Sequence, residues 1–246
     1  MAVAVIMKIR LDKYLADMGC GTRSQVKQEI SKGRVTVNGT TVKRPEYKVD
    51  SASDQVCLAG KPVSYAKFEY YMLNKPAGVV SATKDPVEKT VLDLIDSRRA
   101  DLFPAGRLDK DTEGLLLITN DGELAHRLLS PKKHVDKVYY ACIEGRVTDE
   151  DIALFDAGLD IGDDKPTLPA VLEIIRSNEK SEILLTIKEG RFHQVKRMFH
   201  AAGKEVLYLK RLQMGTLVLD EKLHPGEYRK LTEEEVKNLC LQEKKP

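Results

Sequence analysis

The chain has 246 residues, of which 42% are hydrophobic and 32% are charged, with a formal net charge of +2. This composition is typical of a globular protein with a substantial core and charged surfaces. No apolar run approaches the roughly 20 residues that cross a bilayer, and the start has no signal-peptide pattern, so we expect a cytoplasmic protein without a membrane span. The four cysteines are scattered, which argues against a zinc ribbon or a redox motif.

The charge is unevenly distributed along the chain. Residues 1–65 contain 11 basic and 6 acidic residues, a net of +5, and the remainder contains 29 basic and 32 acidic residues, a net of −3. A small basic unit joined to a nearly neutral larger one predicts an anchor for a polyanion. The alternative is ordinary surface charge.

The first fifty residues have the pattern of a compact unit with two helices and a hairpin. Apolar residues at helical spacing predict a helix over 11–18, and Thr22 with Gln25 forms a capping box before a second helix, which ends at Gly33. Asn38-Gly39 predicts a two-residue hairpin turn. Six basic residues are expected to form a phosphate-binding surface on this unit: Arg10, Lys13, Arg23, Lys27, Lys32 and Arg34.

The rest of the chain predicts an α+β domain after a polar joint over 51–67. Lys75 is expected to be exposed in a loop, and Thr119–Gly122 to form a turn in which Asn and Gly tolerate positive φ. Apolar runs and capping residues predict strands near 68–73, 115–118, 135–144, 170–176 and 183–188, and helices near 90–95, 123–129, 148–154, 195–202 and from Thr232.

The stretch 105–122, AGRLDKDTEGLLLITNDG, places alternating acids before a predicted core strand, with an arginine two residues ahead of the first acid. Loops held on rigid elements are where catalytic groups tend to lie. The residues concerned are Arg107, Asp109, Asp111 and Glu113.

Three interpretations of these acids compete. The spacing resembles the start of a calcium-binding EF-hand loop, but Asn120 stands where the bidentate Glu should be, and apolar residues fill the positions between. A solvated surface turn is the second interpretation. The third is a catalytic carboxylate beside a cation, which would lower its pKa by roughly 1–3 units and keep it ionised as a nucleophile. The residues alone leave the last two open.

A second informative stretch, 189–200, leads from a predicted strand through a glycine into a helix. Val195, Met198 and Phe199 form the inner stripe of this helix. A cationic face lies next to that stripe: His193, Lys196, Arg197 and His200. The helix therefore offers candidate cations for the acid loop.

Several stretches resemble known families. RLDKYLADMGCGTRSQVKQEISKGRVTVNG resembles an S4 domain, a small RNA-binding module. GRLDKDTEGLLLITNDG is similar to the signature loop of pseudouridine synthases, specifically their RsuA branch, and KPAG at 75–78, KVYY at 137–140 and EGRFHQVKRMF at 189–199 match the same branch in order. The resemblance implies an S4 domain over 7–60, a linker over 61–67 and a mixed, mainly antiparallel synthase domain over 68–241.

The resemblance also implies roles for individual residues. Asp109 matches the catalytic aspartate, and Arg107, Tyr139 and Lys196 match the residues that support the active site. Three further residues are implied as RNA contacts or loop supports: Arg191, Gln194 and Arg197. The family's reaction flips a uridine out of its stack and requires no metal or cofactor.

Two stretches, PGEYRKLTEEEV at 225–236 and KPTLPAVLEII at 165–175, most resemble the members of this branch that act on the small ribosomal subunit. This implies the 16S ribosomal RNA uridine numbered 516 as the target, in an assembly precursor, and a monomeric enzyme. A sibling that modifies large-subunit 23S RNA shares the catalytic motifs and stays an alternative. The other alternative is a non-catalytic RNA-binding or assembly factor that uses its S4 domain alone.

Overall fold

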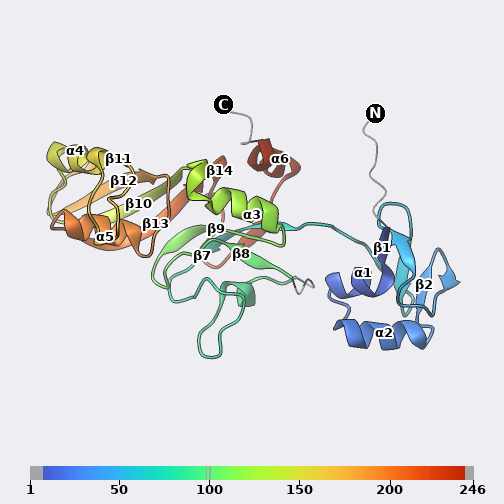
Figure 1. Cartoon of the computed structure of the whole chain (residues 1–246). Coiled ribbons are helices and arrows are strands. Elements are labelled where there is room, and N and C mark those ends of the chain that lie inside the picture. Colours follow the sequence, from blue (N-terminus) through green and yellow to red (C-terminus); the bar gives the residue numbers. More distant parts are fainter. Residues whose placement is uncertain (1–7, 98, 100, 242–246) are drawn as a thin grey trace. The chain divides into compact units, whose positions relative to one another are not determined.

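The computed structural model describes residues 8–97, 99 and 101–241, and it divides into two compact units (Figure 1). One unit contains the described residues up to Glu69 together with Asp96–Leu102, and the second contains Tyr70–Ile95 and the residues from Phe103 onward. Within the described ranges, no helix is long and apolar enough to cross a membrane.

The described part of the N-terminal unit packs two helices against short antiparallel strands (Figure 1). β1 pairs with β4, and a second sheet has the order β3-β2-β5-β6. The elements are β1 (Lys8–Arg10), α1 (Leu11–Asp17), α2 (Arg23–Ser31), β2 (Val35–Val37), β3 (Thr40–Thr41), β4 (Lys48–Asp50), β5 (Val56–Leu58) and β6 (Lys61–Val63).

The local signals expected for this unit are confirmed. Thr22 Oγ1 accepts a hydrogen bond from the Gln25 amide, and the Gln25 side chain accepts one from the Thr22 amide, so the capping box begins α2. Asn38 and Gly39 have φ angles of 52° and 77°, as a tight turn between β2 and β3 requires. β6, which lies within the range that the sequence assigned to a linker, is a strand of this unit's sheet.

The second unit is built on a mixed sheet with the order β11-β12-β10-β13-β9-β7-β15, with β14 beside β13 and β8 beside β9. All of these pairs are antiparallel except β13 with β9, so the predicted mainly antiparallel sheet is confirmed. The strands are β7 (Tyr70–Lys75), β8 (Phe103–Ala105), β9 (Glu113–Thr119), β10 (Lys137–Glu144), β11 (Val171–Arg176), β12 (Lys180–Ile187), β13 (Glu205–Met214), β14 (Leu217–Val218) and β15 (Tyr228–Lys230).

Helices cover this sheet over two separate apolar clusters. Near β10 and β12, Phe155 and Phe199 from two helices pack with ring centroids 4.8 Å apart. Near β7 and β9, Leu124 and Leu239 from two other helices contribute to the second cluster. The helices are η1 (Val91–Leu94), α3 (Gly122–Leu129), η2 (Pro131–Lys133), α4 (Asp149–Ala157), α5 (Gln194–Ala201) and α6 (Glu233–Leu241).

The two halves of the sheet meet where β9 runs parallel to β13, and a glycine permits this contact. Gly114 pairs with Arg211, has a φ of +101°, and has no space for a side chain, because an added Cβ would lie 2.2 Å from the Arg211 carbonyl oxygen. Asp109, five residues earlier, is thereby placed at the junction of the two halves.

Two features differ from the sequence-based expectations. β13 was not predicted, although it lies at the centre of the sheet, because its charged and apolar residues do not alternate cleanly. The turn at Thr119–Gly122 needs no positive φ, so that prediction was wrong: the Asp121 side chain accepts a hydrogen bond from Leu124 and caps α3, which begins at Gly122.

Candidate active site

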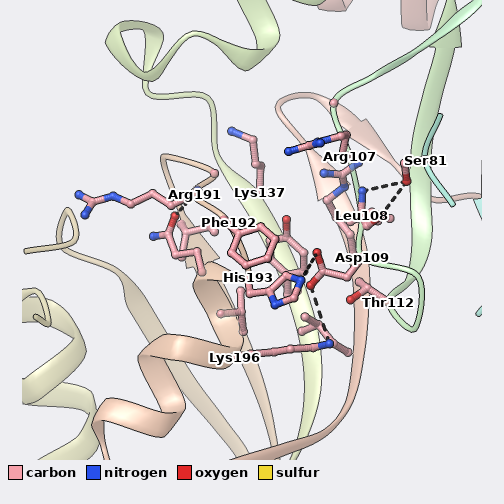
Figure 2. A pocket seen from close by; sticks show the side chains of 18 of the residues that line it. Ser81, Arg107, Leu108, Asp109, Thr112, Lys137, Arg191, Phe192, His193 and Lys196 are labelled. Atoms are coloured by element: carbon pink, nitrogen blue, oxygen red, sulfur yellow. Dashed lines mark hydrogen bonds and ion pairs between the residues drawn. The ribbon is translucent and has the colours of Figure 1, made fainter. Parts of the chain in front are cut away.

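A pocket of about 600 Å³ opens at the junction of β9 and β13 (Figure 2). The acid loop before β9, the Gly190–Lys196 segment, β10 and β13 all contribute to its wall. The four residues that the resemblance assigns to the active site line it together: Arg107, Asp109, Tyr139 and Lys196. They come from segments up to 89 positions apart, so the fold brings the predicted site together.

Asp109 faces two nitrogen-bearing side chains at this pocket (Figure 2). Its Oδ1 lies 3.5 Å from His193 Nε2, and its Oδ2 lies 3.8 Å from Lys196 Nζ. The Asp109 side chain is 27% exposed, which leaves the carboxylate accessible from the pocket while one side faces these groups.

Lys196 makes its shorter contacts with a different acid. Its ammonium group donates to both carboxylate oxygens of Asp111, at 2.6 and 2.7 Å. The hydrogen bond from Lys196 is the main cause that holds the pKa of Asp111 below its usual value, and partial burial opposes it. The resemblance matches Lys196 to a residue that supports the catalytic aspartate and gives Asp111 no catalytic role, whereas in the structure Asp111 is the acid that binds the lysine most closely.

Lys75 supports the acid loop from beneath, and its expected exposure was wrong. Its side chain is fully buried, and its ammonium group donates to the main-chain carbonyls of Asp109, Lys110 and Thr112 as well as Pro76, at 2.8–3.2 Å. Burial is the main cause that lowers the pKa of Lys75 to about 8. The only signal in the sequence was a lysine that ends an apolar strand next to a proline.

The segment after Lys75 adds further bonds to the same loop. The Gly78 amide donates to the Lys110 carbonyl at 2.7 Å. Ser81 Oγ donates to the Leu108 carbonyl and accepts from the Leu108 amide, at 2.8 and 3.0 Å (Figure 2). The backbone around Asp109 is therefore fixed independently of any bound molecule.

The floor of the pocket is mostly apolar and carries a buried aromatic ring. Tyr139 lies on β10, is 7% exposed and pairs across the sheet with Arg211 of β13. Ile187, Val195 and Leu209 also line this part of the pocket. An aromatic ring and aliphatic side chains in the same pocket as a carboxylate suit a planar ring that must be held next to a reacting group.

Two cations lie at the same floor. Lys137 is 5% exposed and donates to the Val135 carbonyl at 3.0 Å, and burial, followed by the charge of Arg211, lowers its pKa to about 8. Arg211 is 2% exposed, and its Nε donates to the Leu115 carbonyl at 2.8 Å. Lys137 belongs to the KVYY motif, which gave it no role of its own, and no pattern in the sequence pointed to Arg211.

The three residues implied as RNA contacts or loop supports brace the loop that precedes α5. Gln194 is 4% exposed; its side chain accepts from the Arg191 amide and donates to Glu189. Arg191 donates to the carbonyls of residues 165 and 166, and Arg197 donates to the carbonyl of Phe192. All three therefore support the loop in this structure.

The other basic residues for which the sequence predicts RNA contacts are exposed. In the N-terminal unit, Arg10 pairs with Asp12, Lys13 with Asp17, and both Lys32 and Arg34 with Glu29. Arg23 and Lys27 lie on the exposed side of α2, and neither has an ion pair with the residues that the structure describes. Arg107 is likewise exposed at the pocket and has no such pair within the described chain.

The acid loop does not have the geometry of a calcium site. Glu113 accepts a hydrogen bond from Tyr208 at 2.7 Å, away from the partners of the other two acids. Among the described residues, no group of three or more His, Cys, Asp or Glu side chains could hold a metal ion. The arrangement suits chemistry by a carboxylate that lies beside a lysine and a histidine, in a pocket lined in part by apolar side chains.

Comparisons with known proteins agree with this geometry. A family model described as RNA pseudouridylate synthase matches residues 69–201, and a model described as the S4 domain matches residues 9–56. The uncharacterised RNA pseudouridine synthase YtzG of Bacillus subtilis is 50% identical over 231 residues, which cover 93% of this chain and 97% of the relative.

Further relatives extend over the same length. Ribosomal small subunit pseudouridine synthase A of Escherichia coli is 44% identical over 231 residues, 93% of this chain and 98% of the relative. A crystal structure of a pseudouridylate synthase, 40% identical, covers 94% of this chain and 99% of its own, with a TM-score of 0.66. The chain therefore belongs to the RNA pseudouridine synthase family, and it is an isomerase that carries an N-terminal S4 domain.

Proposed function

We propose that this enzyme isomerises a uridine of 16S ribosomal RNA, the uridine numbered 516, and that Asp109 is its catalytic residue. The substrate proposal is supported by the 44% identity over nearly the whole chain to enzymes named ribosomal small subunit pseudouridine synthase A. The observation that carries the catalytic proposal is the position of Asp109 on a fixed loop at the pocket, 3.8 Å from Lys196.

The reaction matches the groups that line the pocket. The N1–C1′ bond of the uridine breaks, the uracil turns, and C5 bonds to C1′; the hydrogen of C5 leaves to solvent and N1 gains a proton. Atoms and electrons balance without an oxidant or reductant. A carboxylate such as that of Asp109 supplies the negative charge that this rearrangement needs next to the sugar and the base.

The pocket also suits the uridine. A volume of about 600 Å³ lies in the range of small-ligand sites, so it can take a nucleoside that has left its helix. Stacking on Tyr139 would contribute ~1–3 kcal/mol to holding the uracil. We propose that Arg107, which is exposed at the pocket, contacts a phosphate of the same strand.

We propose that the six basic residues of the N-terminal unit bind the RNA backbone, that the enzyme acts as a monomer, and that it works in the cytoplasm on a precursor of the small subunit. The exposed Arg23 and Lys27, on one helix face, support the first of these proposals. Contacts to phosphates would bind the substrate through its shape and charge, and they would not determine which uridine is isomerised.

The test uses transcripts of 16S and of 23S ribosomal RNA with tritium at C5 of uridine. Pseudouridine formation releases that tritium into water, and sequencing after chemical labelling maps the position. We expect release from the 16S transcript, or from its assembly precursor, at one uridine. Release from the 23S transcript alone would show that the large-subunit alternative is correct.

A further inference from the structure

We propose that Phe192 is a stacking platform at the mouth of the pocket, where it holds an RNA base next to the flipped uridine. The proposal rests on the pocket being the site of uridine isomerisation. It assigns an RNA contact to a side chain for which neither the motif resemblance nor the reaction chemistry gives a role.

Phe192 presents a large apolar ring to solvent beside the catalytic loop. The residue is 69% exposed and lines the pocket (Figure 2). One face of its ring is stacked on the imidazole of His193, with ring centroids 3.8 Å apart and planes at 17°. The imidazole of His193 covers one face of the Phe192 ring. Because the residue is nevertheless 69% exposed, the opposite face is open to a second planar group.

The backbone that carries this ring is fixed. The carbonyl of Phe192 accepts a hydrogen bond from Arg197 at 3.1 Å. The preceding amide, that of Arg191, donates to the buried side chain of Gln194 at 2.9 Å. A contact group that is already held in place loses little conformational freedom on binding, so more of its stacking energy appears as affinity.

His193 links the stack to the reaction site. Its backbone lies in the left-handed region, with φ 48° and ψ 33°, which costs a non-glycine residue on the order of 1 kcal/mol. In this conformation the imidazole puts its face against Phe192 and its Nε2 3.5 Å from Asp109 Oδ1. His193 thus lies between the exposed ring of Phe192 and the carboxylate of Asp109 and contacts both.

An RNA base is the occupant that the surroundings favour. When a uridine leaves its stack, the neighbouring base loses a partner, and every base has a flat face that an aromatic ring can cover. Arg107 lines the same pocket and has no ion pair within the described chain, so its positive charge is available for a phosphate next to that base. An apolar side chain of another protein would gain nothing from this cation.

The natural absence of tryptophan gives a direct test, because Phe192→Trp introduces a single tryptophan into the chain. The matched control is Ile175→Trp, at a residue that is 56% exposed on β11 and lies outside the pocket lining. We expect the 16S transcript to quench the fluorescence of the first variant and to leave that of the second unchanged. An equal response of the two variants, or no response of the first, would overturn the proposal.

A kinetic test separates stacking from a general effect on folding. Phe192→Ala should raise the KM for tritium release by about 5- to 150-fold, the loss of ~1–3 kcal/mol, with little change in kcat. Phe192→Tyr should restore the wild-type KM. An unchanged KM in the alanine variant, or no rescue by tyrosine, would contradict the stacking role. If the wild-type enzyme releases tritium from the 23S transcript and none from the 16S transcript, the proposed substrate is wrong, and the fluorescence and KM tests of stacking are then made with the 23S transcript.

Discussion

The ammonium nitrogen of Lys196 lies 2.6 Å from Asp111 Oδ1 and 3.8 Å from Asp109 Oδ2. The nearer acid is 71% exposed and lies outside the pocket lining, and the farther acid is 27% exposed and lies inside it. Lys196 therefore bridges the two, anchored by Asp111 and directed toward Asp109. We therefore expect Asp109 and Asp111, two acids of one loop, to have different roles and their substitutions to have different effects.

Asp109→Asn should abolish tritium release, with a loss of at least about 10³-fold, because an amide cannot supply the negative charge of a carboxylate. Its RNA affinity should be unchanged, since the side chain keeps its size. Filter binding and the release assay measure the two quantities. Asp149→Asn, at an exposed acid in the first turn of α4, is the matched control for loss of one charge. Full activity of Asp109→Asn would refute the catalytic assignment.

Asp111→Asn should lower kcat only about 1.4- to 5-fold, because an exposed ion pair contributes ~0.2–1 kcal/mol. The pKa of Asp111 is lowered in the folded protein, so its pairing with Lys196 is fully present above the ordinary pKa of about 4 and is lost as pH falls through the lower, folded value. Wild type and variant should therefore converge in strongly acidic buffer, as a pH series of thermal unfolding would show. A kcat loss as large as that of Asp109→Asn would contradict this division of roles.

Lys75→Met should reduce activity by about 10²-fold, because the carbonyls of Asp109, Lys110 and Thr112 lose their shared donor and the loop can shift by ~1 Å. The Asp109 and Lys110 carbonyls keep main-chain donors, whereas the Thr112 carbonyl loses its donor, which should destabilise the second unit by roughly 1–3 kcal/mol. Circular dichroism melts and single-turnover rates test both effects. Lys84→Met, at an exposed lysine, should change neither quantity. Normal rates in Lys75→Met would show that the loop holds its position without the lysine.

Lys137→Met should make the enzyme more stable at neutral pH. Burial, and then the charge of Arg211, lowers the pKa of Lys137 to about 8, while Asp136 and Glu189 raise it less. Below pH 8 the folded protein bears the full cost of the buried charge, and that cost is relieved as pH rises from about 8 toward the unfolded value of about 10.4. The stability gap between variant and wild type should therefore close over this range. A gap that is constant with pH would show that burial does not perturb the lysine.

Two glycines of the same stretch provide a matched pair. Gly114→Ala should prevent proper pairing of β9 with β13, because the added Cβ would lie 2.2 Å from the Arg211 carbonyl oxygen at a φ of +101°. Gly122→Ala should be neutral or stabilise by up to about 1 kcal/mol, since Gly122 begins α3 and an added Cβ meets nothing within 4 Å. Thermal unfolding compares the two variants. A similar melting temperature for both would contradict the requirement for close strand contact.

The sequence by itself determined the features whose causes are local. Thr22 and Gln25 are three residues apart and bond to each other, and Asn38-Gly39 supplies the turn of a hairpin from its own backbone preferences. The apolar run of β9 is fully buried, as its composition predicts. The motif resemblance likewise depends only on the order of residues, so it could single out Asp109, Tyr139 and Lys196, which line one pocket, before any distance was known.

Only the tertiary structure decided what depends on residues far apart in the chain. Lys75 is buried because the acid loop, 34–37 positions later, folds over its ammonium group. Lys196 is held by Asp111, 85 positions earlier, and β13 is a strand because neighbours from two halves of a sheet pair with it. Hydrogen bonds and burial across such distances leave no periodicity in the sequence, since the energy that selects them comes from packing and not from local preference.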